Sequence, residues 1–340
     1  MKLKREKLLG ILEDVKPALA KKEIIEESGN FIFDHNRIIT YNDQICVIHP
    51  LKCDFVCSVP SEEFYNLIKK LTDEIVTLSM DGEWLTIKTK TTKAELAAAG
   101  ETSILELVEQ FPDFKPWKKI PDKLLQAIKW CAFSASRNAT LPYLTSVYIS
   151  NKYVMATDEL RISKYDLPAK MADDMMIPAE AAKQLLAFKP IKYSVKDGWC
   201  FFQNEHKVVF CTRVIDGKYP ARQYLNEFEF EGKKVLLPAK LSEALEVAEV
   251  LADGQIVEEK RIDIKLKDGQ LFIKAEKQDI GKLAKVMKVK YNKRKAITMT
   301  INPIFLNEIL TKTNKVVIGD DRALFKTGPF SHLVSLFTEE

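Results

Sequence analysis

A short pattern occurs three times along the chain at nearly equal intervals. Each copy begins at a proline, continues as a short amphipathic run, and then becomes a strand-like run with an acidic turn. The prolines are Pro60, Pro178 and Pro303, and the turns are Asp81-Gly82, Asp197-Gly198 and Asp320-Asp321. Self-similarity at a fixed spacing indicates that one structural unit is repeated, and it constrains the fold more strongly than local patterns. The sequence therefore predicts three copies of one domain, at residues 1–115, 116–227 and 228–340.

Each predicted domain contains two helices among several strands. Apolar residues at helical spacing predict a first helix over about 5–16, 121–134 and 239–251 in the three copies. The second helix of each copy begins at the repeated proline, which suits the start of a helix. The remaining apolar runs are short and β-rich, and the Asp-Gly pairs at 81–82, 197–198 and 268–269 are typical of hairpin turns. The predicted fold class is α+β, with two helices packed on antiparallel β-sheets in each domain.

Composition narrows the class of protein. Of the 340 residues, 46% are hydrophobic and 29% are charged, which is typical of a globular protein. No apolar stretch approaches the roughly 18 residues of a membrane span, and acidic residues interrupt the N-terminus before any signal-like core. The six cysteines form no CxxC pair, which favours buried, reduced thiols. We therefore expect a cytoplasmic protein with no membrane partner.

The sequence lacks the common motifs of catalytic and cofactor sites. It contains no GxGxxG, GxxxxGK[ST] or HExxH motif and no zinc-type cluster, and its four histidines are scattered. Three acidic pairs, Asp158-Glu159, Asp173-Asp174 and Asp320-Asp321, leave a metal-dependent nuclease open as an alternative. Adjacent residues of a strand point to opposite faces, however, so such pairs rarely converge on one metal. We expect no catalytic residue, no cofactor and no metal.

Two motifs in the middle third, and the segment before them, resemble a known family. They are ATDELRISKY at 156–165 and FCTRVIDGKYPARQYL at 210–225, preceded by FPDFKPW at 111–117. They are similar to the bacterial DNA polymerase sliding clamp, the beta subunit of the DNA polymerase III holoenzyme. That family shows Ala-Thr-Asp-Gly-His-Arg-Leu and then Val-Asp-Gly-Arg/Lys-Phe/Tyr-Pro, in the same order and at similar spacing. Toward both ends of the chain, the resemblance depends on the repeat and the order of the elements.

The resemblance implies a non-catalytic DNA polymerase processivity factor. Three clamp domains per chain would close head to tail with a second copy, giving a homodimeric ring around double-stranded DNA of any sequence. The implied partners are DNA, a DNA polymerase, the clamp loader and the second copy of the chain. A clamp-fold interaction protein that does not encircle DNA remains a second alternative.

The helix faces opposite the apolar stripes carry candidate DNA-facing cations. These are Arg5, Lys69, Lys70, Lys129, Lys183 and Lys312. The resemblance adds Lys21, Arg137, Asn138 and Tyr143 near DNA. The net charge is +4, and the middle third is the basic one, with 17 basic and 10 acidic residues over 116–225. The helix predicted at 239–251 instead carries Glu243, Glu246 and Glu249, so it would attract DNA little.

The resemblance also implies a pocket for short partner peptides and a dimer interface. The matching pocket residues are Leu144, Thr157, Leu160, Arg161, Ile162, Pro220, Arg222, Val334, Leu336 and Phe337. The matching interface residues are Leu96, Val250 and Leu251. The chain departs from the family at two places, because Glu159-Leu160 replaces Gly-His and the tail is SLFTEE. We therefore expect the specificity for partner peptides to differ.

Overall fold

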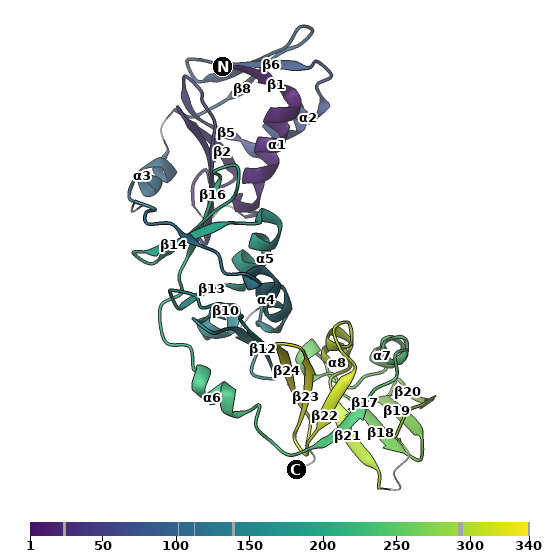
Figure 1. Cartoon of the computed structure of the whole chain (residues 1–340). Helices are drawn as coiled ribbons and strands as arrows, with labels where there is room; N and C mark the ends of the chain where they lie inside the picture. The colour runs from purple at the N-terminus through teal and green to yellow at the C-terminus, as the bar shows by residue number, and fades with distance from the viewer. Residues whose placement is uncertain (23–24, 101, 112, 138–139, 292–294, 339–340) are drawn as a thin grey trace. The chain divides into compact units, whose positions relative to one another are not determined.

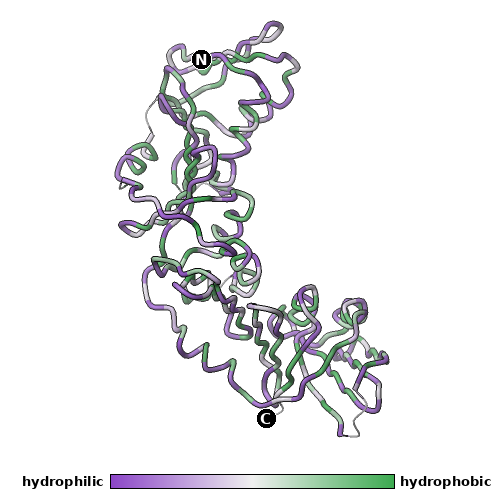
Figure 2. Tube along the Cα trace, in the orientation of Figure 1, coloured by the Kyte–Doolittle hydropathy of each residue, from purple (hydrophilic) through white to green (hydrophobic). Residues whose placement is uncertain are grey.

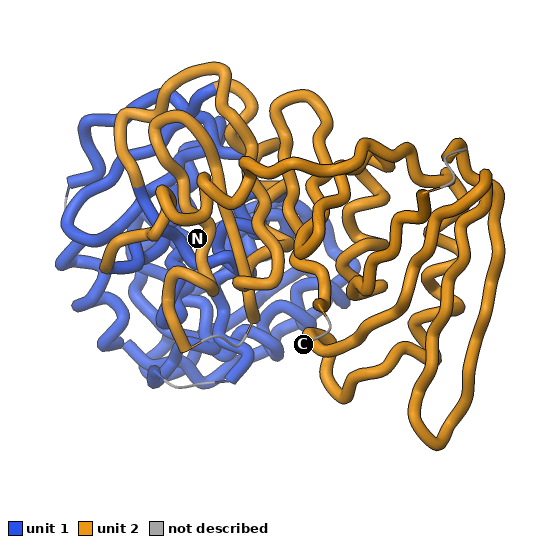
Figure 3. Tube along the Cα trace, turned by 90° about the horizontal axis from the view of Figure 1, so that it is seen from below, with its two compact units in different colours: residues 1–121, 175–216 blue, residues 122–174, 217–340 orange. Residues whose placement is uncertain are grey.

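The computed structural model of the chain is shown in Figure 1. It describes residues 1–340 apart from 23–24, 101, 112, 138–139, 292–294 and 339–340. The chain divides into two compact units, each made of two separate stretches of sequence (Figure 3). Unit 1 comprises Met1–Pro121 and Met175–Asp216, and unit 2 comprises Asp122–Asp174 and Gly217–Glu340. Within the described residues, no helix combines the length and apolar character that a membrane crossing requires.

Unit 1 contains two antiparallel sheets and four α-helices among its described residues. The helices are α1 (Arg5–Val15), α2 (Ser61–Lys70), α3 (Ser103–Glu109) and α5 (Ala179–Phe188), with a 3-10 turn η1 (Lys16–Ala18). The strands are β1 (Lys2–Lys4), β2 (Asn30–Asp34), β3 (Arg37–Tyr41), β4 (Ile45–Pro50), β5 (Val56–Pro60), β6 (Ile75–Asp81), β7 (Trp84–Lys88), β8 (Lys93–Ala97), β9 (Lys118–Lys119), β13 (Met175–Pro178), β14 (Lys192–Lys196), β15 (Trp199–Gln203) and β16 (Val209–Arg213). One sheet has the order β1-β6-β7-β8, and the longer one has the order β5-β2-β3-β4-β16-β15-β14-β9.

Unit 2 repeats this plan. Its helices are α4 (Leu124–Cys131), α6 (Ala221–Asn226), α7 (Leu241–Glu249) and α8 (Pro303–Leu310), with 3-10 turns η2 (Ala132–Ser134), η3 (Pro142–Thr145) and η4 (Val257–Glu259). Its strands are β10 (Ser146–Ile149), β11 (Tyr153–Thr157), β12 (Arg161–Asp166), β17 (Lys233–Leu236), β18 (Ile262–Lys267), β19 (Gln270–Lys277), β20 (Gly281–Lys288), β21 (Ile297–Ile301), β22 (Lys315–Ile318), β23 (Arg322–Thr327) and β24 (Phe330–Ser335). The short sheet has the order β20-β19-β18-β21, and the longer one runs β10-β11-β12-β24-β23-β22-β17.

Each long sheet forms where two meanders meet through one antiparallel strand pair. In unit 1 this pair is β4 and β16, with Cys46 opposite Cys211. In unit 2 it is β12 and β24, with Ser163 opposite His332. The joined residues are more than 150 positions apart in the sequence, yet the pairing makes one continuous hydrogen-bonded layer of each unit. The predicted α+β class with antiparallel sheets is confirmed, whereas the boundaries of the three domains stay a prediction.

The helices and strands follow the predicted apolar patterns. Helix α1 buries Leu8, Ile11, Leu12 and Val15, as its helical spacing predicts. Along β18, buried and exposed residues alternate, as expected for a sheet with one covered face. Figure 2 shows hydrophobic and hydrophilic stretches interspersed along the whole trace. In these elements the apolar residues therefore lie on one stripe of the helix or on one face of the sheet.

Two predicted hairpins are confirmed in their turn geometry. Asp197 and Gly198 have φ values of 50° and 76°, and Asp268 and Gly269 have values of 49° and 79°. Two consecutive residues with positive φ are the requirement of a type I′ hairpin turn, which Asp-Gly satisfies at low cost. The turns connect β14 to β15 and β18 to β19 in register.

Helices α3 and α6 were not among the predicted helices. Helix α3 begins after Thr102, whose side chain accepts a hydrogen bond from the Ile104 amide at 3.1 Å. The helix buries Ile104 and Val108 in a cluster with Trp199 and other residues of β15. The aromatic segment that follows α3 joins the same cluster, since the Phe111 and Trp199 ring centroids are 4.6 Å apart. Phe111, Phe114 and Trp117 therefore pack against the unit 1 core.

We predict that Asn302→Ala destabilises unit 2 by about 1–2 kcal/mol, because Asn302 is the N-cap of α8. Its carboxamide oxygen accepts hydrogen bonds from the amides of Ile304 and Phe305 at 2.9 and 3.2 Å. Its nitrogen donates to the Val257 carbonyl at 2.6 Å. Urea unfolding measures the effect. Asn302→Ser keeps a cap acceptor without placing a carboxylate oxygen against the Val257 carbonyl, so it should lose less stability than Asn302→Ala. Equal losses in the two variants would contradict the capping role.

Candidate functional site

A polar cavity of about 260 Å³ lies in unit 2, beside the hairpin that carries the ATDELRI motif. Its walls come from the β11–β12 hairpin, helix α6, and strands β23 and β24. The lining residues are Glu159, Arg161, Ile162, Gln223, Tyr224, Glu227, Asp321, Arg322, Leu333 and Ser335. This set combines a small apolar base with several charged groups, so the cavity can recognise a side chain by both shape and charge.

The β11–β12 hairpin is held by side chains that satisfy its own backbone. The Thr157 hydroxyl accepts from the Glu159 amide at 3.0 Å and donates to the Arg161 carbonyl at 2.7 Å. The Asp158 carboxylate accepts from the amides of Leu160 and Arg161 at 3.2 and 3.0 Å. These bonds fix Glu159 at a φ of 74°, in the left-handed region that favours glycine. The turn therefore presents the Glu159 side chain, which is exposed, at the edge of the cavity.

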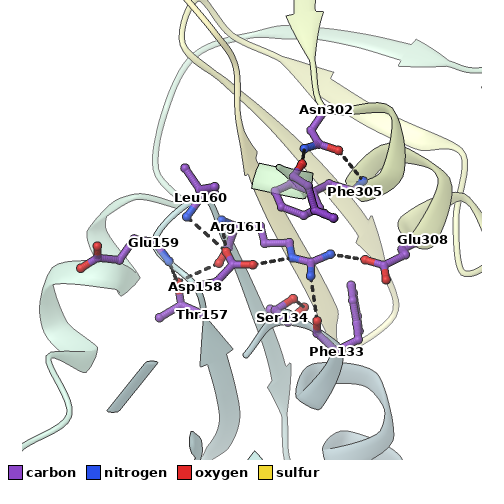
Figure 4. Close-up of polar contacts among 12 residues, drawn as sticks. Phe133, Ser134, Thr157, Asp158, Glu159, Leu160, Arg161, Asn302, Phe305 and Glu308 are labelled. Carbon is purple, nitrogen blue, oxygen red and sulfur yellow. Dashed lines mark hydrogen bonds and ion pairs between the residues drawn. The ribbon is translucent and has the colours of Figure 1, made fainter. Parts of the chain in front are cut away.

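Arg161 is the most connected side chain of the site (Figure 4). Its Nε donates to Asp158 at 2.9 Å, one terminal nitrogen donates to the Phe133 carbonyl at 2.9 Å, and the other pairs with Glu308 of α8. The guanidinium also lies 4.0 Å from the centroid of the Phe305 ring. Only 8% of the residue is exposed. A planar fork with five donors suits such a crowded position, because each partner meets a separate N–H group.

A buried polar chain continues from Arg161 across the β12–β24 pair. The Ser163 hydroxyl lies 2.7 Å from the Ser134 hydroxyl and 2.8 Å from Nδ1 of His332. Nε2 of His332 is buried, and it has no hydrogen-bond partner among the described residues. Burial, and secondarily the positive charges of Arg161 and Lys312, hold the pKa of His332 well below its usual range. The imidazole is therefore neutral at physiological pH.

Burial also shifts two charged neighbours toward their neutral forms. It lowers the pKa of Lys312, whose ammonium lies 3.9 Å from the centroid of the Phe133 ring. It raises the pKa of Asp158, and the nearby Arg161 charge offsets this only in part. The ion pair between Asp158 and Arg161 is therefore a buried one, for which loss of a single partner is costly.

A second arginine closes the opposite wall of the cavity. Nε and one terminal nitrogen of Arg322 donate to the two Asp321 oxygens at 2.8 and 2.6 Å, and the other terminal nitrogen pairs with Glu227. This fork-like geometry is characteristic of strong arginine–carboxylate pairs. The hydrogen bond to Arg322 lowers the pKa of Asp321, and the same pairing raises the pKa of Arg322.

The predicted pocket residues divide between the cavity and its surroundings. Arg161 and Ile162 line the cavity, and the half-buried Leu160 belongs to the same hairpin. Leu144 and Thr157 are both buried. Leu144 lies in η3, and Thr157 is the last residue of β11, at the start of the hairpin turn. Pro220 and the exposed Arg222 lie at the start of α6, directly before the lining residues Gln223 and Tyr224.

The C-terminal strand supplies different residues from the predicted ones. In β24, Val334 pairs with Arg161, and Leu333 pairs with Ile162. Val334 and Leu333 are adjacent in the strand, so their side chains point to opposite faces of the sheet. Leu333 and Ser335 line the cavity, and Val334 is fully buried on the other face. Leu336 and Phe337 line a separate groove of about 730 Å³, together with residues of β18, β19 and β21. The sequence shows that alternate residues of this strand share a face. Only the pairing register with β12 shows which of the two faces lines the cavity.

The candidate DNA-facing cations are mostly exposed. Lys21, Lys69, Lys70, Lys129, Arg137 and Lys183 are exposed, and Arg5 is half-buried. Lys312 differs, because it packs on Phe133 and its ammonium lies 3.5 Å from the Glu308 carbonyl. The Tyr143 hydroxyl donates to the Glu159 carboxylate at 3.2 Å, so this tyrosine belongs to the edge of the cavity. Asn138 lies outside the described residues.

The candidate interface residues lie at the outer strands of the two short sheets or next to them. Leu96 is in β8, the last strand of the unit 1 short sheet, and it is half-buried. Val250 follows α7 and is 72% exposed, and Leu251 is half-buried. On β20, the outer strand of the unit 2 short sheet, Val286 is 54% exposed.

The acidic pairs that left a nuclease open have structural partners. Asp158 is bound by Arg161, and Asp321 is bound by Arg322. Asp174 accepts hydrogen bonds from the Asn151 amide at 2.7 Å and from the Tyr148 hydroxyl at 3.2 Å. Across the part of the chain that the structure describes, no group of three or more His, Cys, Asp or Glu side chains is arranged to hold a metal ion. No geometric support for metal-dependent cleavage comes from these pairs.

We predict that the folded protein loses stability as the pH falls below about 6.5, because the unfolded chain then binds a proton at His332 that the folded chain excludes. The contribution of this residue is at most about 1.4 kcal/mol per pH unit in that window. Urea unfolding between pH 7.5 and 5 should show a shallower pH dependence for His332→Gln than for the natural protein. His206→Gln changes an exposed histidine and serves as the control. An unchanged slope in His332→Gln would contradict the prediction.

Comparison with known proteins agrees with the geometry at the level of the fold. No protein-family model matches the sequence, and no curated protein sequence matches it. Solved structures do match over the full length. The DNA polymerase sliding clamp from Pseudomonas aeruginosa superimposes with a TM-score of 0.83 at 16% identity, covering 100% of this chain and 99% of that chain.

Clamps from other bacteria give similar values. The DNA polymerase sliding clamp from Bacillus subtilis has a TM-score of 0.82 at 15% identity, with coverage of 100% and 99%. The beta subunit from the DNA polymerase of Streptococcus pyogenes has a TM-score of 0.82 at 19% identity, with coverage of 99% for both chains. The chain therefore has, along its whole length, the fold of the bacterial DNA polymerase III beta sliding clamp.

Proposed function

We propose that this chain is a non-catalytic processivity factor of a DNA polymerase, acting in the cytoplasm as a homodimeric ring around double-stranded DNA. The observation that carries the proposal is the full-length likeness, with a TM-score of 0.83, to a DNA polymerase sliding clamp. The middle-third motifs, which form the β11–β12 hairpin and the start of α6, support it independently.

A ring stays on DNA because it is closed, so it does not need strong binding. Tight ion pairing would slow sliding, and contacts to base edges would add unwanted sequence preference. A modest net charge of +4 with scattered exposed lysines is compatible with this requirement. A polymerase tethered to such a ring rebinds its template at a high effective concentration, which raises processivity without any chemistry by the ring.

Dimer formation is supported by the outer strands of the short sheets. An outer strand presents unpaired backbone N–H and C=O groups, which favours pairing with another chain. β8 and β20 are such strands, and β20 is eight residues long. Exposed apolar side chains accompany them, including Val250 and Val286. Pairing of β8 of one copy with β20 of the other would be heterologous, and two such contacts would close a ring.

We predict a native mass of twice 38.9 kDa at micromolar concentration. Val250→Glu should weaken the dimer about 100-fold, since an unpaired charge buried in an interface costs roughly 3 kcal/mol. Sedimentation equilibrium measures the change. The matched control is Ile191→Glu, which introduces the same charge at another exposed apolar residue, outside the proposed interface. A natural protein that stays monomeric would contradict the proposal, as would equal effects of the two variants.

We also predict that the combined variant Lys69→Glu, Lys70→Glu and Lys129→Glu binds duplex DNA more weakly and with a reduced salt dependence. Each lost phosphate contact should lower the slope of log K against log salt by about 0.9. Fluorescence anisotropy with a labelled duplex at several salt concentrations measures the slope. The control replaces Lys265, Lys267 and Lys274 by Glu on the exposed face of the unit 2 short sheet. A larger loss in this control would contradict the assigned DNA-facing surface.

The polar cavity of unit 2 is the proposed docking point for peptides of the polymerase and of the clamp loader. It contains the residues of the motif that resembles the clamp family, and it is lined by both apolar and polar groups. A Pseudomonas aeruginosa sliding clamp has been solved bound to griselimycin, so a protein of this fold can hold a ligand.

One observation favours a second candidate, a clamp-fold interaction protein that does not encircle DNA. Helix α7 exposes Glu243 and Glu246, and Glu249 pairs with Lys260 at 3.4 Å. An acidic helix would repel phosphates if it faced a DNA channel. A homodimeric ring that neither binds duplex DNA nor stimulates a polymerase on a primed circular template would favour this candidate over the processivity factor.

A further inference from the structure

We propose that the polar cavity of unit 2 receives a basic side chain, arginine or lysine, of a partner peptide, with Glu159 as its counter-ion. The inference rests on the proposed docking of peptides at this cavity and assigns the chemistry of one residue in that peptide. It concerns only groups of unit 2.

The two arginines of the cavity are already neutralised by protein groups. Arg161 is paired with Asp158 and Glu308, and Arg322 is paired with Asp321 and Glu227. Each guanidinium thus faces two carboxylates, so neither has an uncompensated positive charge to offer an acidic ligand. An acidic peptide side chain would have to displace one of these carboxylates, which lie in buried or bidentate pairs.

Of the three carboxylates that line the cavity, Glu159 is the one without a cationic partner among the described residues. Its contact is the Tyr143 hydroxyl, which donates to it at 3.2 Å. Burial and a hydrogen bond with Tyr143 raise the pKa of Tyr224, so the Tyr224 phenol is neutral. Because Arg161 pairs with Val334, its guanidinium lies on the other face of the β12–β24 pair from Ile162 and Leu333. The charged groups on the cavity side are therefore three carboxylates and the guanidinium of Arg322, a net charge of −2. The cavity therefore favours a cation.

The remaining lining fits the stem of a basic side chain. Ile162 and Leu333 share one face of the β12–β24 pair and form the apolar base. Tyr224 adds an aromatic ring, on which a cation can stack. Lysine and arginine place their methylene groups along such apolar surface while the charged head reaches polar groups. A volume of about 260 Å³ suits one long side chain better than a whole ligand of drug size, which needs roughly 300–1,000 Å³.

The backbone at Glu159 gives a separate reason to look for a role of its side chain. Its φ of 74° would suit glycine without strain, whereas a residue with a Cβ there costs on the order of 1 kcal/mol. The clamp family, which the motif resembles, has glycine at this position. This chain thus places a carboxylate where the backbone favours no side chain.

The test uses host peptides that differ at one residue. Acetyl-Ala-Ala-Arg-Ala-Ala-amide is titrated into the methyl-labelled full-length protein, and the Ile162 and Leu333 methyl signals report binding. The analogues with citrulline, norleucine and glutamate at the central position are titrated in the same way. Citrulline keeps the shape and hydrogen bonding of arginine without its charge. We expect the arginine peptide to bind at least tenfold more tightly than each analogue, and more weakly at high salt.

Two variants separate binding from folding. Glu159→Gln should lower the affinity for the arginine peptide about tenfold and leave the citrulline peptide unaffected. Glu159→Gly should lower it as much while keeping or increasing the stability to urea, because glycine relieves the left-handed backbone. Equal binding of arginine, citrulline and norleucine peptides would overturn the inference, and so would preferred binding of the glutamate peptide or no binding at the cavity.

The same samples distinguish this inference from the proposed function. Sedimentation and duplex-DNA binding are measured on the natural protein and on Glu159→Gln. A dimer that binds DNA but shows no preference for the arginine peptide overturns only the assignment of the basic side chain. A monomer without DNA binding that still selects the arginine peptide overturns the processivity factor and supports the assignment.

Discussion

The guanidinium of Arg161 connects three segments of unit 2 that are distant in sequence. It binds the Asp158 turn, the Phe133 carbonyl after α4, and Glu308 of α8, and it stacks on Phe305. The β12–β24 pair, the hairpin and the cavity wall all depend on this residue. Its removal would leave the buried Asp158 carboxylate without a counter-charge, which is among the more costly changes inside a protein.

In unit 1, the strand pair that joins the two meanders is stabilised by a different kind of interaction from the one in unit 2. Around the β4–β16 pair, Cys46, Cys211 and Phe201 are buried with the aromatic side chains after α3, so the hydrophobic effect dominates. The corresponding pair in unit 2 has Ser163 opposite His332, with Ser134 beside them. Apolar burial is insensitive to pH, whereas a neutral buried imidazole is not. One plan of strands is thus stabilised in two ways.

Much of the fold was predictable because its signals are local. The apolar stripe of α1, the Asp-Gly turns and the ATDELRI hairpin each lie within a few residues and involve bonds among neighbours. The faces of β24 were not predictable, because only pairing with β12 decides that Leu333 and not Val334 lines the cavity. Helix α3 was missed for a related reason: its seven residues are stabilised by distant Trp199 more than by their own pattern. Arg322, likewise, acquires its role only beside Glu227, 95 residues away in sequence.

The division of each unit into two stretches of sequence has a consequence for synthesis on the ribosome. The long sheet of unit 1 needs β14, β15 and β16, so it cannot be completed until Arg213 has been made. Residues 122–174, which belong to unit 2, emerge before unit 1 is finished, and the pairing of their strand β12 with β24 must wait until Ser335 has been made. The strand edges of β4 and β12 are therefore exposed in turn on the growing chain. Each long sheet is therefore completed only after a distant segment has been made, and chaperone protection matters most during these two intervals.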